Sequence, residues 1–264
     1  MNNLLKHRWF ETRHNPIFWI TLIVCCAFAF LVSSFTGLKY LTDPPMVAGI
    51  SYDIQGFFSA LTADAIFPLL IISGAFTAMM LGQIFSDRTI DQEITAGHSR
   101  KSIFVSQCIT GFFVSNIAVF LAILVGCLRW AGSIPYPSAG EMLPYLFRSV
   151  VLLILLNFSR FSACILIVIL MRDIAKTITT SALFLLVACW SMPAVEQTVP
   201  QVHGTLYTIY PSLPLLLHPA FLMRYALYST LTPFQGLWTA GVALGWTILF
   251  LGIAYCMFLR CELK

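Results

Sequence analysis

Six long, uninterrupted apolar stretches constrain this chain more than any other feature of its sequence. Each is close to the ~20 mostly apolar residues with which an α-helix crosses the core of a bilayer. Leu, Ile, Phe and Val lie on every side of these stretches instead of alternating with polar residues, which favours a helical bundle over a membrane barrel. We therefore predict an all-α integral membrane protein with six spans, in a single transmembrane domain covering residues 1–264. The predicted spans are Pro16–Phe35, Ala65–Phe85, Ile103–Leu128, Phe147–Met171, Thr177–Val195 and Gln235–Leu259.

Composition supports the same class of protein. The chain is 59% hydrophobic and 10% charged, whereas about 25% of the residues of a soluble domain are charged. A soluble fold could not cover its surface with so few charges. Intrinsic disorder, a nucleic-acid-binding domain and a disulfide-stapled secreted scaffold are excluded as well.

The basic residues indicate the orientation of the six spans. An even number of spans places both termini on one side, and most of the fifteen basic residues lie in segments on that side. Because cytoplasmic loops carry the excess of Lys and Arg, we predict cytoplasmic N and C termini. The basic residues on this side are Lys6, Arg8, Arg13, Arg88, Arg100, Lys101, Arg172, Lys176, Arg260 and Lys264.

Two further segments have a predicted structure. Residues Asn2–His14 combine apolar residues at helical spacing with Lys6, Arg8 and Arg13, which predicts a basic amphipathic helix at the inner membrane surface. The external segment Glu196–Phe234 is rich in both proline and apolar residues. Short helices there, such as one over Pro219–Ser229, would satisfy their backbone against the bundle.

The loop between the second and third spans predicts a short amphipathic helix over Asp87–Ala96. Ser86 can cap this helix, and Asp87 in its first turn is favourable at the positive helix end. Ile90 and Ile94 share one face at i, i+4 spacing, and Asp91 lies near Arg88 on the polar side. A rigid cytoplasmic helix joined to two membrane helices could act as a lever.

The end of this loop carries a family resemblance. Gly97 can end the short helix in a left-handed conformation, and Ser99 can cap the next span. The step Gly97-His98-Ser99-Arg100 resembles the Gly-x-Ser-Arg step after the coupling helix of type-2 ABC transporter permeases. The six-span layout and the short turn Met171–Lys176 also agree with this family. The chain departs from the family motif at Gln107, which stands roughly where many members carry a lysine.

The resemblance implies a function and partners. In the family, this loop helix docks in a groove of a cytoplasmic ATPase subunit, and two permease domains enclose a translocation path. The chain has no GxxxxGK[ST] phosphate loop, so ATP and Mg would bind to the partner ATPase. The resemblance further implies a second permease subunit, same or homologous, and a multi-pass place in a bacterial plasma membrane. The residues implied in ATPase coupling are Asp87, Arg88, Ile90, Asp91, Glu93, Ile94, Gly97, Ser99 and Arg100.

In this reading the Ile90/Ile94 face is buried in the ATPase, and Asp91 and Glu93 meet its basic groups. Closure of the ATPase dimer would push the loop helix and switch the permease between inward and outward access. The apolar, aromatic-rich spans suggest an amphipathic or hydrophobic cargo such as a peptide, a lipid or a drug. Export as the direction of transport follows from the resemblance alone.

Small residues recur at four-residue steps in two spans and allow close helix approach. In the second span they are candidates for a pathway wall, a subunit interface or packing within the bundle; in the last span we expect packing within the bundle. The second-span residues are Gly74, Ala78 and Gly82, and the last-span residues are Gly241, Gly245 and Gly252.

Polar residues gather in the middle of the fourth span, among them Asn157 and Arg160. An arginine at this depth costs ~2.5–3.5 kcal/mol, so Arg160 should face protein or water. It could hold helix-end carbonyls, pair with a second subunit or meet an anionic part of a substrate. We therefore regard Asn157 and Arg160 as candidates for a pathway or an interface.

Enzymatic readings find little support. The five histidines are scattered, and neither HExxH nor GxSxG occurs. We therefore predict no catalytic, cofactor-binding or metal-binding residue on this chain. The alternative to an ABC permease is a secondary transporter or a structural membrane subunit; a secondary transporter should show inverted repeats and coupling carboxylates.

Overall fold

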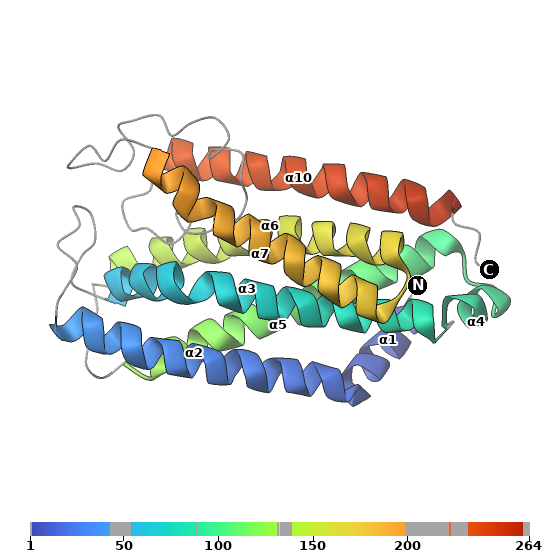
Figure 1. Ribbon diagram of the computed structural model, residues 1–264, viewed down its shortest axis with the longest axis horizontal. Coiled ribbons are helices and arrows are strands. Elements are labelled where there is room, and N and C mark those ends of the chain that lie inside the picture. Colours follow the sequence, from blue (N-terminus) through green and yellow to red (C-terminus); the bar gives the residue numbers. More distant parts are fainter. Residues whose placement is uncertain are drawn as a thin grey trace.

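The computed structural model describes residues 2–42, 54–87, 89–130, 132, 139–198, 222 and 232–260. All regular elements in these ranges are helices (Figure 1). In chain order they are α1 (Asn2–His14), α2 (Pro16–Thr42), α3 (Ile54–Ser86), α4 (Thr89–Thr95), α5 (Arg100–Leu128), α6 (Ala139–Met171), α7 (Ile174–Thr198) and α10 (Pro233–Arg260).

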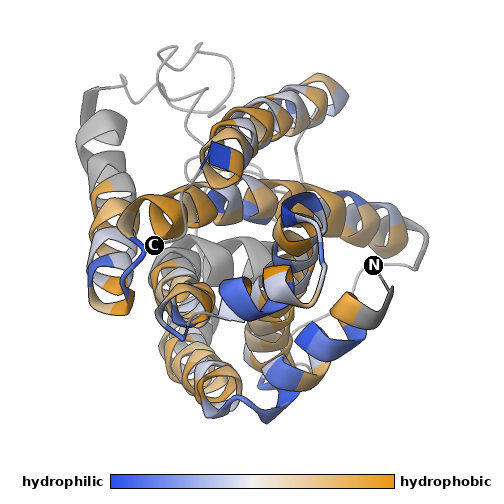
Figure 2. Cartoon of the chain, turned by 90° about the vertical axis from the view of Figure 1, so that its right-hand side faces the viewer, coloured by the Kyte–Doolittle hydropathy of each residue, from blue (hydrophilic) through white to orange (hydrophobic). Residues whose placement is uncertain are grey.

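The long helices form a bundle whose two short helices lie at one end. In Figure 1, α2, α3, α5, α6, α7 and α10 run along the long axis, and α1 and α4 lie at the right-hand end. Figure 2 views the bundle from that end and shows hydrophilic residues gathered on α1 and α4. We call this the α1/α4 end of the bundle.

Four of the long helices are long and apolar enough to cross a membrane: Pro16–Phe35 in α2, Arg100–Leu128 in α5, Met142–Met171 in α6 and Pro233–Arg260 in α10. Within the residues searched, α3 and α7 contribute the shorter apolar stretches Ile71–Ser86 and Ile174–Val187. Large apolar side chains such as Phe113, Phe147 and Ile248 are exposed, as lipid-facing residues are. The fold is that of a multi-pass helical membrane protein.

The start of α2 follows directly from the local sequence. Asn15 precedes this helix, and its side-chain Oδ1 accepts a hydrogen bond of 2.9 Å from the backbone N–H of Ile17. Pro16 occupies the first helical position, where a missing N–H has no consequence. The chain can therefore turn sharply from α1 into the long helix.

Two parts of the predicted structure lie outside the described residues. The external segment 196–234, with the predicted helix Pro219–Ser229, is described only at residues 196–198, 222 and 232–234, and of these Leu222 packs in the core. Arg88 of the predicted coupling loop is also outside them.

The small-residue stripe of α3 packs within the chain. A Cβ added to Gly74 would approach Leu185 and Arg160, and one added to Gly82 would contact Ile174 and Thr177. Ala78 is fully buried. This face of α3 therefore contacts α6 and α7 and allows their close approach.

The prediction for the last span is wrong on this point. A Cβ added to Gly241, Gly245 or Gly252 would meet no atom of the described residues within 4 Å. These glycines lie on the open side of α10, whose contacts within the bundle are mainly with α6.

One buried glycine gives a stability prediction. A Cβ on Gly111 of α5 would lie 2.8 Å from the ring of Phe161 and 3.3 Å from Leu81. Because this packing is tight on both sides, Gly111→Ala should lower the free energy of unfolding by about 1–3 kcal/mol. Gly245→Ala is the matched control and should be neutral or stabilising by up to about 1 kcal/mol. Unfolding in detergent measures both, and equal stability of the two variants would contradict the packing.

Candidate functional site

The short helix α4 is shorter than predicted and begins later. Ser86 is the last residue of α3 and Asp87 lies in the turn that follows, so neither belongs to the first turn of α4. The C-terminal end is as predicted, because Gly97 has a φ of 87°. The N–H of Gly97 donates to the backbone carbonyl of Ile94 at 2.9 Å. The N–H of His98 donates to the backbone carbonyl of Glu93 at 3.0 Å. This is the bond pattern of a Schellman cap.

The next helix, α5, has its N-cap in the residue directly before it. Ser99 precedes α5, and its Oγ accepts a hydrogen bond of 3.3 Å from the N–H of Ser102, as predicted. Arg100 donates a hydrogen bond of 3.2 Å to the backbone carbonyl of Leu259 at the end of α10. A cation near the carbonyl end of a helix is favourable. Capping therefore fixes α4 to α5, and Arg100, expected in ATPase coupling, contacts this chain.

The apolar face of α4 is also covered by the chain itself. Ile90 is 2% exposed and belongs to a core cluster with Leu4, Ile103 and Phe258, against which Ile94 packs. The expectation that the Ile90/Ile94 face is buried in a partner is therefore wrong. Asp91 is partly exposed, and the exposed positions of the helix and its end are Gln92, Thr95, Ala96 and Gly97.

Glu93 forms a buried ion pair with α1. Its carboxylate accepts a hydrogen bond of 2.7 Å from Nη2 of Arg8, and the two side chains are 7% and 4% exposed. Nη1 of Arg8 donates to Glu11 at 3.1 Å. The expectation that Glu93 meets the basic groups of a partner is thus corrected, because its charge is already balanced within the chain. The pair connects α1 to α4.

Burial sets the electrostatics of this pair. Loss of water raises the pKa of Glu93, and the adjacent guanidinium of Arg8 opposes the rise without cancelling it. Arg8 therefore favours the charged form of Glu93, against the effect of burial. A second polar contact holds α1 near the bundle, because Nδ2 of Asn15 donates to Oε1 of Gln83 in α3 at 2.9 Å.

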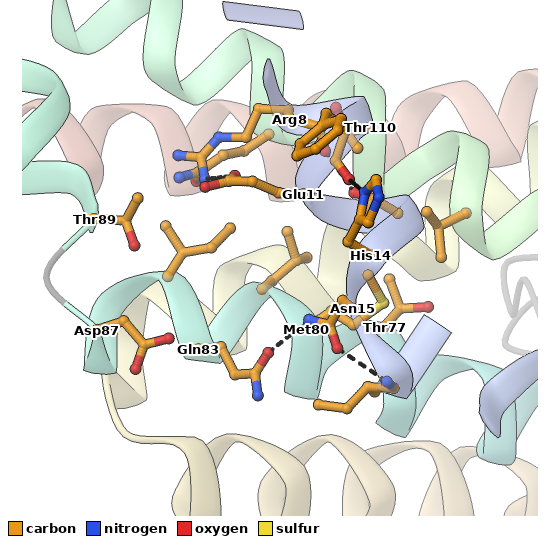
Figure 3. Close-up of a pocket in the computed structure, with 18 of the residues that line it drawn as sticks. Arg8, Glu11, His14, Asn15, Thr77, Met80, Gln83, Asp87, Thr89 and Thr110 are labelled. Atoms are coloured by element: carbon orange, nitrogen blue, oxygen red, sulfur yellow. Dashed lines mark hydrogen bonds and ion pairs between the residues drawn. The ribbon is translucent and has the colours of Figure 1, made fainter. Parts of the chain in front are cut away.

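A cavity of about 540 Å³ lies between α1, α2, α3 and α5 (Figure 3). Its α1 wall includes Arg8, Glu11 and His14, and its α3 wall includes Thr77, Met80 and Gln83. Gln107 and Thr110 line it from α5. The cavity therefore has polar and apolar walls and reaches from the α1/α4 end into the depth of the membrane helices.

Arg160 lies deeper in the bundle and holds three helices together. Its Nη1 donates to Ser73 Oγ of α3 at 2.9 Å, and its Nη2 donates to Ser115 Oγ of α5 and to Asn157 Oδ1, each at 2.5 Å. The absence of a side chain at Gly74 leaves room for the guanidinium. Of the predicted roles, holding protein groups is the one that these contacts support, through side chains instead of helix-end carbonyls.

The sequence predicted the end of α4 at Gly97 and the cap of α5 at Ser99, but neither the start of α4 nor the Arg8–Glu93 pair. The two residues are 85 positions apart, and their helices are short and charged. A basic residue on the polar side of α1 gives no local sign that it is buried. Gln107, noted only for its place in the motif, proves to be a wall of the cavity.

Among the residues that the structure describes, no three His, Cys, Asp or Glu side chains lie close enough together to hold a metal ion. No protein-family model matches the chain, and comparison with curated proteins finds no match.

Proposed function

We propose that the chain is the membrane-spanning subunit of an ATP-driven exporter of the type-2 ABC family. It has six spans in a bacterial plasma membrane, cytoplasmic termini, and α1 as an elbow helix at the inner surface. ATP and Mg bind to a separate cytoplasmic ATPase, and a second permease subunit completes the translocation path. The cargo is amphipathic or hydrophobic.

The observation that carries the proposal is the way in which α4 is held. This helix ends in a Schellman cap just before the capped start of α5, buries Ile90 against the bundle and is joined to α1 through Arg8 and Glu93. A force on its exposed side is therefore passed to α3, α5 and α1 instead of being absorbed by a loose loop. ATP binding to the partner shifts the inward–outward equilibrium through its different affinity for the two states.

The proposed docking face consists of the exposed residues Gln92, Thr95 and Ala96, with Asp91 at its edge. Arginine is a good helix former and is favourable near a helix C-terminus. Thr95→Arg therefore changes this face without disturbing the fold. Arg13→Gln, at another exposed site of the α1/α4 end, is the matched control.

The experiment is purification of the tagged chain from its native membrane. The wild-type chain and Arg13→Gln should bring down an ATPase with a phosphate loop and vanadate-sensitive ATP hydrolysis. Thr95→Arg should lose at least about 90% of this activity, since about 1.4 kcal/mol corresponds to a tenfold change in affinity, while its unfolding temperature stays the same. If no ATPase accompanies the chain and Thr95→Arg changes nothing, a secondary transporter or a structural subunit replaces the proposal.

A further inference from the structure

The cavity between α1, α3 and α5 contains a buried side-chain nitrogen that donates no hydrogen bond to a described residue. Gln107 is 7% exposed and lines the cavity from α5. Its Nε2 atom is buried and has no hydrogen-bond partner among the described residues. Leaving such a group unsatisfied costs free energy, and rotation of the amide can present either of its ends to the cavity.

Two threonines of the cavity offer hydrogen-bond acceptors. Thr77 and Thr110 use their hydroxyl protons on the backbone carbonyls of Ser73 and Ser106, at 2.6 and 2.9 Å. Their oxygens therefore face the cavity as acceptors. A donor group of a bound molecule can therefore be paired with these two oxygens.

The charges of the cavity also favour a cation. The guanidinium of Arg8 donates to two carboxylates, those of Glu11 and Glu93. Asp87 lines the cavity as well and makes no ion pair with a described residue. Among the residues that line the cavity, the two carboxylates of Glu11 and Asp87 lie with one guanidinium, that of Arg8, and with the imidazoles of His7 and His14. These two carboxylates can balance the charge of a bound cation.

The remaining walls are apolar. The cavity is lined by Met80 and Ile84 of α3 and by Val114 of α5. Gln107 lies roughly 10 Å along α5 from Arg100, because an α-helix rises 1.5 Å per residue. A volume of about 540 Å³ is within the range of sites for drug-sized ligands. Figure 3 shows α1 side chains facing those of α3 across this space.

We propose that the cavity beneath α1 binds an amphipathic organic cation. The positively charged amine of the ligand lies near Asp87 and Glu11, and its apolar body contacts Met80 and Ile84. An acceptor atom on this body accepts a hydrogen bond from the side-chain amide of Gln107. That the cavity binds such a cation is argued from the cavity alone. That the cavity is where the cargo enters the exporter rests on the proposed function.

The test uses the purified full chain in detergent, without any ATPase. Rhodamine 6G is the probe, because it is a cation with a flat apolar body and an ester carbonyl, and fluorescein is its anionic counterpart. Fluorescence polarisation, corrected for empty micelles, gives the Kd of each dye. Rhodamine 6G should bind saturably, and fluorescein should bind at least tenfold more weakly.

Two variants locate the bound dye. Gln107→Met, which keeps the volume, and Asp87→Asn, at an exposed turn, should each raise the Kd of rhodamine 6G by about three- to tenfold. Asp173→Asn removes a carboxylate from the turn between α6 and α7 and keeps the oxygen that accepts from the N–H of Lys176. This control should leave the Kd unchanged.

Three results would overturn the inference: the same Kd in all variants, equal binding of fluorescein, or displacement of the dye by phosphatidylcholine, which would assign the cavity to a lipid. The proposed function fails separately. If an ATPase accompanies the chain but rhodamine 6G does not bind, only the cavity assignment is wrong. If the dye binds and no ATPase is found, the exporter is wrong and the binding site remains.

Discussion

Replacement of Arg8 by methionine should lower the free energy of unfolding by about 3–5 kcal/mol. The variant removes the guanidinium 2.7 Å from Glu93 and leaves a carboxylate that is 7% exposed without its counter-ion. Truncating one member of a buried pair costs more than the pair itself contributes, because the remaining charge stays desolvated. Unfolding in detergent micelles measures the loss.

The pH dependence identifies Glu93 as the cause. Its pKa is raised by burial and held down in part by Arg8, so Arg8→Met should raise it further. A group with a raised pKa in the folded state contributes stability that is present at low pH and lost as pH rises through that pKa. The defect of Arg8→Met should therefore shrink as pH falls from about 8 to about 5. In Arg8→Met/Glu93→Gln this pH dependence should be absent.

A local measurement separates release of α1 from global unfolding. Leu4 of α1 is 2% exposed and shares a core cluster with Ile90. A Leu4→Cys thiol should react slowly with maleimide in the otherwise wild-type chain, and at least tenfold faster when Arg8→Met is added. The reason is that a loss of about 1.4 kcal/mol or more in local stability raises the population with α1 released from the bundle tenfold. Unchanged reactivity would mean that α1 is held without the ion pair.

The cores of the long helices, the end of α4 and the cap of α5 could be predicted because their signals are local, whereas α3 and α6 begin earlier than predicted, at Ile54 and Ala139. The apolar stretches place the cores of the long helices, and Gly97 and Ser99 fix the ends of α4 and α5 through their own backbone and side chain. Errors occurred where a cap was assigned by residue type alone. Ser86 has the chemistry of a cap, yet α3 continues through it.

The partners of each face could not be predicted in the same way. Amphipathy shows that Ile90 and Ile94 need cover, but it does not say whether another chain or α1 and α5 provide it. The charge of Glu93 likewise suggested an exposed contact, and only the distant Arg8 makes its burial possible. For Arg160 the sequence indicated that polar partners are needed, while Ser73 and Ser115 come from other helices.

The second large effect is expected at Asn157. Its Oδ1 accepts from Nη2 of Arg160, and its Nδ2 donates to Ser115 Oγ at 3.3 Å. Asn157→Leu leaves the guanidinium buried with one acceptor fewer, and hydrogen bonds to charged groups contribute about 1.5–3 kcal/mol. We expect a loss of about 3 kcal/mol in the free energy of unfolding, measured in detergent.

Removal of the charge itself should cost less. In Arg160→Met the desolvated guanidinium is gone, and Ser115 and Asn157 keep their mutual hydrogen bond, so we expect a loss of about 1 kcal/mol. The double variant Asn157→Leu/Arg160→Met should be more stable than Asn157→Leu alone. If the double variant is the less stable of the two, the guanidinium stabilises the bundle beyond these contacts. Because Arg160→Met should remain folded, its transport activity separates the remaining roles of this arginine: full activity assigns it to helix packing, and loss of activity in the folded protein assigns it to the substrate path.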